Sequence, residues 1–364
     1  MANSDTSPSR VGLVEGGSDN QALFLKKFSG EILTTFEEKN IMKPLHTIRT
    51  IQNGKSAQFP VTGVATASYH TPGQNIADAG NAYLSDIAKT EKVINIDKVL
   101  LASTFLANID DVMNHYDIRS VYANELGNVL ANRFDTAVLK TFIAAARSAA
   151  NLTQTGKTGG QLDVSKNLLT SDPDYGSADA VSDPTGATLI AALFTAAQKL
   201  DENDVSSDGR FCVLSPENYY KLLTGGGANG QINVASSAVN SDIGGQGSIA
   251  TGNIPQIAGI SIFKSNHVPT NDLTSGNFID TSHEDYDNDN DSNNNIFGGT
   301  TGYNGNFTNT VGIVAHSSAV GTVKLLDLAT ESEYQIERQG TLFVAKYAMG
   351  HGVLRPESCI ELIK

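Results

Sequence analysis

The feature that most restricts the fold is an uninterrupted helical pattern over residues 110–150, which contain no proline. Apolar side chains recur there at the spacing of one helix face. These residues are Val112, Tyr116, Ala123, Leu126, Leu130, Phe134, Ala137, Val138 and Phe142. Roughly 38 residues in an α-helix extend for about 57 Å, and Asp110 and Asp111 suit the positive end of the helix dipole. A helix of this length predicts an elongated domain built along a spine rather than a compact enzyme.

An extended arm is predicted over residues 46–105. Residues 46–64 alternate like a pair of strands with Asn53-Gly54 as the turn. Residues 63–86 lack periodicity and predict a long exposed excursion. A strand pattern then returns, marked by Val93, Ile94 and Ile96. Because a two-stranded ribbon is only marginally stable alone in water, this arm needs a surface to lie on, and a neighbouring subunit would provide one.

Helices and strands alternate in the second half of the chain, after a flexible arm over 1–18 and a helix over 20–40. The predicted elements are a hairpin at 159–171, helices at 185–203 and 215–223, and strands at 210–214, 257–268 and 310–316. Ser215 is placed as an N-cap and Pro216 at the first helical position. The alternation predicts one α/β layer domain over 186–320. The spine helix and the long strands after residue 320 predict a second, elongated α+β domain.

Charge and cysteine content exclude several classes of function. The formal net charge is −14 with no block of Lys and Arg, so direct binding to nucleic acid through phosphate neutralisation is not expected. The polar N-terminus does not resemble a signal peptide, and no run approaches the ~18 apolar residues of a membrane helix. Cys212 and Cys359 lie in separate apolar runs, which predicts buried free thiols in a protein made in reducing cytoplasm.

The run DYDNDNDSNNN at residues 285–295 resembles part of a calcium-binding loop. An EF-hand loop needs a glycine at position 6 and a glutamate at position 12. Started at Asp285 or at Asp287, the run supplies neither residue. Asp and Asn also form turns. We therefore expect a solvated loop rather than a metal site.

Other partial motifs carry no complete chemistry. GGGANG at 225–230 lacks a βαβ context, and GKS at 54–56 and GKT at 156–158 lack the upstream glycine of a P-loop. Asp111 and His115 have a metal-capable spacing but also suit a helix start. His351 and Arg355, in AMGHGVLRPES, are consistent with an active-site loop, although a tight turn with a structural arginine is favoured. Nothing assembles a nucleophile, a base and an orienting group, so the sequence predicts no enzyme and no catalytic, cofactor-binding or metal-binding residues.

Five collinear stretches identify a known family. They are LFLKKFSGEILTTF at 23–36, GKSAQFPVTG at 54–63, MNHYDIRSVY at 113–122, HSSAVGTVKLLDLATE at 316–331 and AKYAMGHGVLRPE at 345–357. Together they resemble the major capsid proteins of short-tailed, T-seven-like bacteriophages (autographiviruses). The similarity weakens at 1–20, at 145–185 and across 224–250 and 270–309.

The resemblance implies an α+β fold of the Hong Kong 97 type. Its implied segments are an N-terminal arm (1–45), an E-loop ribbon that reaches over a neighbour (46–105), a peripheral domain with the spine helix (106–185), an axial domain (186–320) and peripheral-domain strands (321–364). It implies a structural head protein of the virion capsid, self-assembled as pentamers and hexamers into an icosahedral shell in the host bacterial cytoplasm. A scaffolding protein, a portal protein and packaged double-stranded DNA, enclosed without specific binding, are the implied partners, and no membrane is involved.

Two alternatives stay open at this stage. One is an encapsulin-like cellular shell that holds cargo enzymes, and the other is a calcium-dependent surface protein, suggested only by residues 285–295. Some capsids of this fold also crosslink their subunits through a ribbon lysine, a position that Lys55 could fill. Because no catalytic acid is identifiable and this family is not known for the reaction, we expect no crosslink here.

Overall fold

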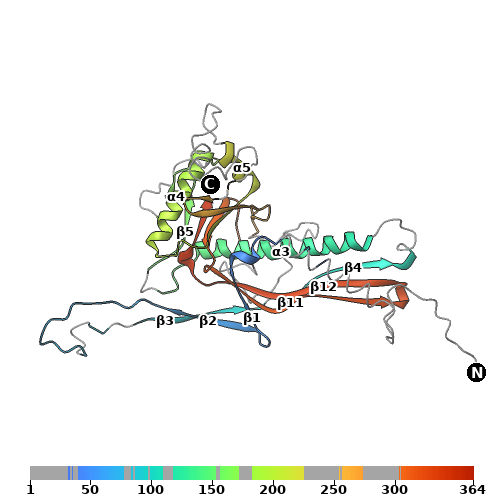
Figure 1. Ribbon diagram of the computed structural model, residues 1–364, viewed down its shortest axis with the longest axis horizontal. Helices are drawn as coiled ribbons and strands as arrows, with labels where there is room; N and C mark the ends of the chain where they lie inside the picture. Colours follow the sequence, from blue (N-terminus) through green and yellow to red (C-terminus); the bar gives the residue numbers. More distant parts are fainter. Residues whose placement is uncertain are drawn as a thin grey trace, which may run out of the picture. The chain divides into compact units, whose positions relative to one another are not determined.

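A computed structural model of the chain is shown in Figure 1. It describes residues 32, 35, 40–77, 83–84, 87–96, 99–109, 118–152, 156–171, 183–224, 254, 256–273, 303 and 305–364. The chain divides into two compact units. The first contains Met1–Ile41, Lys98–Asp135 and Leu325–Met349, and the second contains Met42–Asp97, Thr136–Lys324 and Gly350–Lys364.

The predicted spine helix is α3, Ile118–Arg147, whose 30 residues extend for about 45 Å. The start predicted at Asp110 lies outside the described residues. In the first unit, α3 buries Ala123, Leu130 and Phe134, as its apolar repeat predicted. The edge of the Phe134 ring meets Tyr347, with ring centroids 6.5 Å apart, so this apolar face contributes to the core of the unit.

A second helical segment lies close to α3 in the first unit. Ile32 and Thr35 are helical and buried, and the rest of the helix predicted at 20–40 is outside the described residues. The Thr35 hydroxyl donates to Asn124 Oδ1 over 2.7 Å. A Cβ on Gly127 would lie 2.9 Å from the Thr35 Cβ. The absence of a side chain at Gly127 is therefore what lets the two segments approach.

The second unit contains a seven-stranded sheet with the order β6-β5-β13-β10-β7-β9-β8. Its strands are β5 (Gly160–Asp163), β6 (Leu168–Leu169), β7 (Arg210–Leu214), β8 (Gln256–Ile257), β9 (Ile260–Lys264), β10 (Thr310–His316) and β13 (Cys359–Ile363). The β5–β6 hairpin confirms the one predicted at 159–171. The strand predicted at 210–214 is also confirmed, with all five residues buried.

Helix α4 (Gly186–Glu202) packs its apolar face into the core of this unit. Thr185 caps it, because the Thr185 hydroxyl accepts from Thr188 N–H and the Thr188 hydroxyl accepts from Thr185 N–H, which is a reciprocal capping arrangement. Helix α5 (Pro216–Thr224) begins as predicted, with Asn218 N–H donating to the Ser215 hydroxyl. Both helices therefore follow directly from local sequence.

The seven-stranded sheet is not confined to the predicted range 186–320. It includes β5 and β6 from before that range and, next to β10, the C-terminal strand β13. The pattern of residues 321–364, which include β13, predicts that they all belong to the other, peripheral domain. That assignment is wrong because a short apolar run predicts a buried strand without naming its partner, and β13 pairs antiparallel with β10 and parallel with β5.

The remaining strands form a four-stranded and a two-stranded sheet. The first has the order β1-β11-β12-β4, and the second is β2-β3. The bounds are β1 (Thr47–Thr50), β2 (Ser56–Thr62), β3 (Lys89–Asn95), β4 (Leu100–Ala107), β11 (Val320–Gln335) and β12 (Gly340–Val353). The 3₁₀ turns are η1 (Lys43–Leu45), η2 (Ile336–Arg338) and η3 (Pro356–Ser358).

Residues 46–64 do contain two strands, β1 and β2, but the prediction that these two strands pair with one another is wrong. β1 pairs in parallel with Gly321–Lys324 of β11, and β2 pairs antiparallel with β3. The segment around Asn53-Gly54, where Gly54 has φ +116°, therefore joins two different sheets instead of closing a hairpin. The predicted two-stranded ribbon does form, but its strands are 56–62 and 89–95 only.

Candidate functional site

The β2–β3 ribbon is buried at its base and exposed beyond it. Ala57 and Ile94 face one another in the register and are 6% and 2% exposed. Val61 and Thr62, at the other end of β2, are half-buried and exposed. The described residues that follow, 63–77, have no helix or strand, and those after Val64 are exposed. The base of the ribbon is thus fixed to the second unit, and the rest offers surface for contact.

Glycines on the long strands make room for the base of the ribbon. A Cβ on Gly350 would lie 1.9 Å from Asn95 O, and one on Gly352 would lie 2.7 Å from the Ile94 side chain. Gly321 is similarly close to the Leu354 side chain, at 2.7 Å. The glycines that flank His351 therefore serve close approach of a neighbouring strand. The tight turn favoured for this segment is wrong, because β12 continues to Val353.

Two histidines and a threonine form a buried hydrogen-bonded series, in which Thr322 and His351 are next to these glycines in the sequence. His46 Nδ1 lies 2.6 Å from Met42 O, and His46 Nε2 lies 2.7 Å from Thr322 Oγ1. Thr322 Oγ1 is in turn 2.8 Å from His351 Nδ1. Since a carbonyl only accepts, Nδ1 of a neutral His46 donates and its Nε2 accepts from the Thr322 hydroxyl. His351 Nδ1–H then donates to Thr322, so one set of tautomers satisfies the chain.

The environment of His351 favours the uncharged ring. Burial, and to a smaller extent the neighbouring His46, lower the pKa of His351 to about 3. The backbone N–H of His351 donates to the Tyr303 hydroxyl over 3.0 Å, and the centroids of the two rings lie 5.7 Å apart. The group is therefore a neutral structural histidine at neutral pH. It does not have the accessible, titrating imidazole of a general base.

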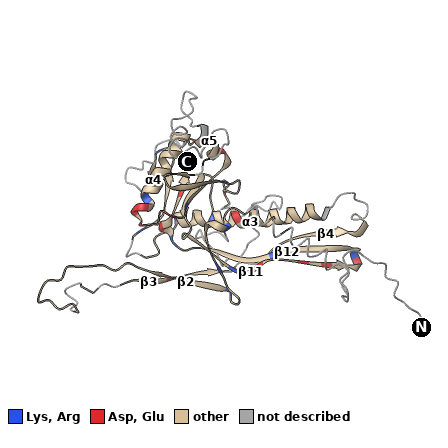
Figure 2. Cartoon of the chain, in the orientation of Figure 1, with Lys and Arg blue, Asp and Glu red and all other residues tan. Residues whose placement is uncertain are grey.

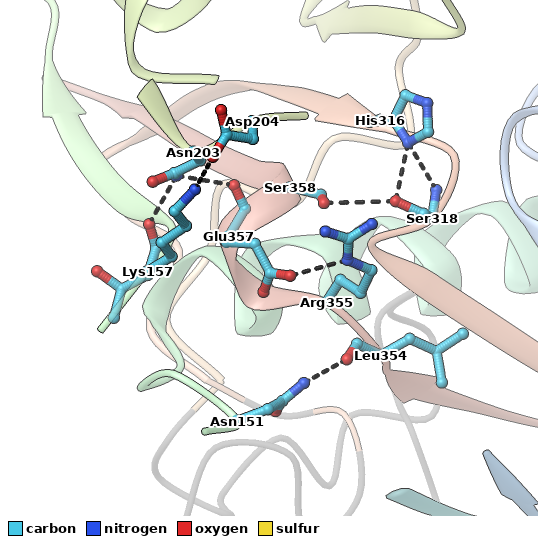
Figure 3. Close-up of polar contacts among 11 residues, drawn as sticks. Asn151, Lys157, Asn203, Asp204, His316, Ser318, Leu354, Arg355, Glu357 and Ser358 are labelled. Carbon is cyan, nitrogen blue, oxygen red and sulfur yellow. Dashed lines mark hydrogen bonds and ion pairs between the residues drawn. The ribbon is translucent and has the colours of Figure 1, made fainter. Parts of the chain in front are cut away.

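A pocket of about 540 Å³ lies beside the ribbon in the second unit. Consecutive residues of β2, from Phe59 to Thr62, form one side. The other side comes from the segments around Asn151, Asn203 and Leu354. Figure 3 shows the polar side chains that gather there. This arrangement gives the second half of β2 a mixed polar and apolar border.

Hydrogen bonds and ion pairs hold the pocket wall. Asn203 Nδ2 donates to Thr158 O over 3.0 Å and to Glu357 O over 2.9 Å. Asn203 thereby ties the end of α4 to the η3 turn (Figure 3). Lys157 pairs with Asp204, and Arg355 Nε lies 2.8 Å from Glu357 Oε1. Each cation has an acidic partner, so the wall has no concentrated charge to capture an ion. The structural role of Arg355 that its sequence context favoured stays a prediction.

A buried ion pair fixes the end of α3 to the seven-stranded sheet. Glu361 is fully buried and accepts from Arg147 Nε and Nη2, each over 2.7 Å. Gln161 and the Thr310 hydroxyl donate the remaining two hydrogen bonds, over 2.8 and 2.7 Å. The Arg147 guanidinium also lies 5.6 Å from the centre of the Phe307 ring. Each carboxylate oxygen therefore accepts two hydrogen bonds. The cluster joins α3 to the sheet, and Glu361 is not available as a catalytic acid.

The other predicted site residues do not come together. Cys212 and Cys359 are buried and unbonded to one another, as predicted, and burial raises the pKa of the Cys359 thiol. Asp111, His115 and residues 225–230 and 285–295 lie outside the described residues. Across the described ranges, no group of three or more His, Cys, Asp or Glu side chains could hold a metal ion. No helix there is long and apolar enough to cross a membrane.

Two groups of buried polar residues were not predicted: the hydrogen-bonded His46, Thr322 and His351, and the cluster around Glu361. Their members are far apart in the chain, so spacing carries no signal for them. Glu361 does carry one: it is a single acid within an apolar strand pattern, and a fully buried carboxylate is almost always paired. Figure 2 shows acidic and basic residues at separate positions along the described helices and strands.

These elements define the class of protein. The chain matches a chain of the capsid structure of cyanophage P-SCSP1u with a TM-score of 0.67 and 37% sequence identity, over 99% of this chain and 98% of that one. The fold is thus the Hong Kong 97-type fold of phage capsid proteins, as expected. The model of the Gp10A-like major capsid protein family matches residues 58–363, and the chain belongs to this family.

Curated relatives agree with that family. The chain is 36% identical to the major capsid protein of Enterobacteria phage T3 over 353 residues, which cover 96% of this chain and 93% of the relative. It is also 36% identical to the major capsid protein of Escherichia phage T7 over 360 residues, which cover 95% and 93%. The protein is a structural capsid protein that assembles with copies of itself into the virion shell. A cellular cargo shell and a calcium-dependent surface protein are not favoured.

Proposed function

We propose that the shell built by this chain encloses packaged double-stranded DNA without binding a particular sequence. The observation that carries the proposal is the formal net charge of −14 with no block of basic residues. Phosphate contacts from Lys and Arg supply most non-specific DNA affinity. A shell that lacks such a surface can retain a dense polyanion mechanically and release it when the head opens.

Assembly would proceed through pentamers and hexamers in the host bacterial cytoplasm, with a scaffolding protein and a portal protein as partners. The resemblance of residues 316–331 and 345–357 to short-tailed phage capsid proteins supports these partners. The two buried free cysteines suit a protein folded in a reducing compartment. In this proposal the chain has a structural role without enzymatic activity.

We propose that the chain has five structural segments. They are an N-terminal arm (1–45), an E-loop ribbon (46–105), a peripheral domain with the spine helix (106–185), an axial domain (186–320) and peripheral-domain strands after residue 320, without β13, which pairs with β10. Strand pairing adds β5, β6 and β13 to the sheet of the axial segment. Lys55 would form no covalent crosslink through its side chain, and its backbone carbonyl accepts from Ile96 N–H, over 2.9 Å, at the ribbon base.

The nucleic acid inside purified particles tests the proposal. We expect nuclease-resistant double-stranded DNA of genome length, and no measurable affinity of free subunits for short DNA duplexes at physiological salt. Particles filled with protein cargo or RNA would contradict it. Tight, sequence-dependent binding of a duplex by free subunits would contradict the claim of enclosure without specific recognition.

A further inference from the structure

The outer edge of β3 has the properties of a strand-pairing surface. Ile96 N–H donates to Lys55 O and Gly63 N–H donates to Ala88 O. Because backbone hydrogen bonds alternate along an antiparallel pair, the even-numbered residues of β3 face β2. The backbone groups of Lys89, Glu91 and Val93 therefore face away from β2. Within the described ranges no strand pairs with this edge.

The outer edge of β2 differs because a proline of β2 and a side chain of β1 block it. The outward positions of β2 are Gln58, Pro60 and Thr62, by the same alternation. Gln58 O already accepts from Arg49 Nη1 over 3.0 Å, and Pro60 has no N–H to donate. Proline at such a position is a common means of protecting an edge strand. One edge of the ribbon is protected and the other is not.

We propose that β3 pairs antiparallel with β3 of a second copy of this chain, about a two-fold axis at Thr90. In this register Lys89 lies opposite Glu91 of the second copy, and Glu91 lies opposite its Lys89. Ile87 lies opposite Val93 in the same way. Ile87 and Val93 are 43% and 48% exposed in the single chain, and Lys89 and Glu91 are also exposed. The β3 edge of each copy therefore carries both partners of each pair, so two identical edges are complementary.

Charge selects this register over its neighbours. Moving the axis by one residue places Lys89 opposite Lys89 or Glu91 opposite Glu91. Opposite charges across an antiparallel pair are stabilising and like charges are destabilising. A two-fold contact also uses the same patch on both copies, which is the commonest geometry in homo-oligomers. The result is a four-stranded ribbon, β2-β3-β3-β2, that joins two subunits within a shell.

Charge reversal tests the pairing in particles formed by the full-length chain. Lys89→Glu or Glu91→Lys alone turns two attractive pairs into two repulsive ones and lowers the association constant of the contact about tenfold. We expect a smaller fraction of each variant in sedimenting particles, and recovery when both changes are combined. Assembly of both single variants at the wild-type level, or failure of the double variant to recover, would overturn the proposal.

A crosslink provides an independent test. Thr90 and its symmetry mate form a pair without hydrogen bonds, with Cα atoms about 4.5 Å apart, which a disulfide can span. Particles of Thr90→Cys should give covalent dimers on a non-reducing gel after mild oxidation. The matched control is Thr62→Cys, which is exposed on the protected edge and should remain monomeric. Absence of Thr90→Cys dimers, or equal dimer formation by the control, would show that another surface joins the ribbons.

Discussion

Glu361→Gln provides a sharp test of how the seven-stranded sheet is held to α3. The carboxylate is fully buried and receives four hydrogen bonds, two at each oxygen. Glutamine keeps the shape but has only one acceptor oxygen, so two of the four donors would face its NH₂ group. The charge that complements Arg147 is lost as well.

The expected loss follows from these contacts. Breaking a buried ion pair costs about 3–5 kcal/mol, and we take the lower end because the Arg147 side chain is 25% exposed and water can reach it. A loss of about 3 kcal/mol lowers the melting temperature by about 6–12 °C in a domain of 150–250 residues. Differential scanning calorimetry of variant and wild-type particles at one fixed scan rate measures the change.

Two matched variants make the result specific. Glu357→Gln removes the partner of Arg355, whose side chain is 47% exposed, and surface pairs contribute less than about 1 kcal/mol. The double variant Arg147→Met/Glu361→Gln removes both charges and keeps an acceptor oxygen at position 361, so it should be less destabilised than Glu361→Gln, because no unpaired charge remains. If Glu361→Gln particles melt within 2 °C of wild type, by the ~2–4 °C per kcal/mol relation, the cluster does not hold the sheet as described.

Three further predictions concern the ribbon base and the spine. His351 has a pKa near 3 in the folded chain and about 6.5 in an unfolded one, so its contribution is complete above pH 6.5 and is lost as the pH falls toward 3. Wild-type particles should therefore lose stability over that window more steeply than His351→Gln particles, and parallel pH profiles would contradict this. Gly350→Ala places a Cβ against Asn95 O and should cost about 1–3 kcal/mol by overpacking, measured as a lower melting temperature; an unchanged value would show that the strands separate freely. Leu130→Pro, at a buried position within α3, should cost about 3 kcal/mol or more and give insoluble protein, whereas soluble, assembling protein would refute the spine assignment.

Local patterns in the sequence were enough to predict the main helices. The apolar repeat through Leu130 and Phe134 predicted α3, and the Thr185 and Ser215 caps bounded α4 and α5. These signals lie within a few residues of the structure that they specify, so no long-range information is required. The β5–β6 hairpin is predictable for the same reason.

Strand partners could not be predicted in the same way. Alternation in residues 46–64 identified two strands but could not show that β1 pairs with β11, over 270 residues away. The glycines at 350 and 352 suggested a turn because their true cause, the close approach of Ile94 and Asn95, is a tertiary contact. Alternation alone predicted the ribbon and its need for a neighbouring surface, and the resemblance to a capsid family implied that this surface belongs to another copy of the chain.

The central claim is that this chain builds a closed shell from copies of itself. Electron microscopy of the purified full-length chain, expressed with and without the proposed scaffolding protein, tests that claim most directly. The account predicts closed icosahedral particles of uniform diameter when the scaffold is present. If the folded chain remained as soluble monomers or small oligomers under both conditions, the central claim would be contradicted.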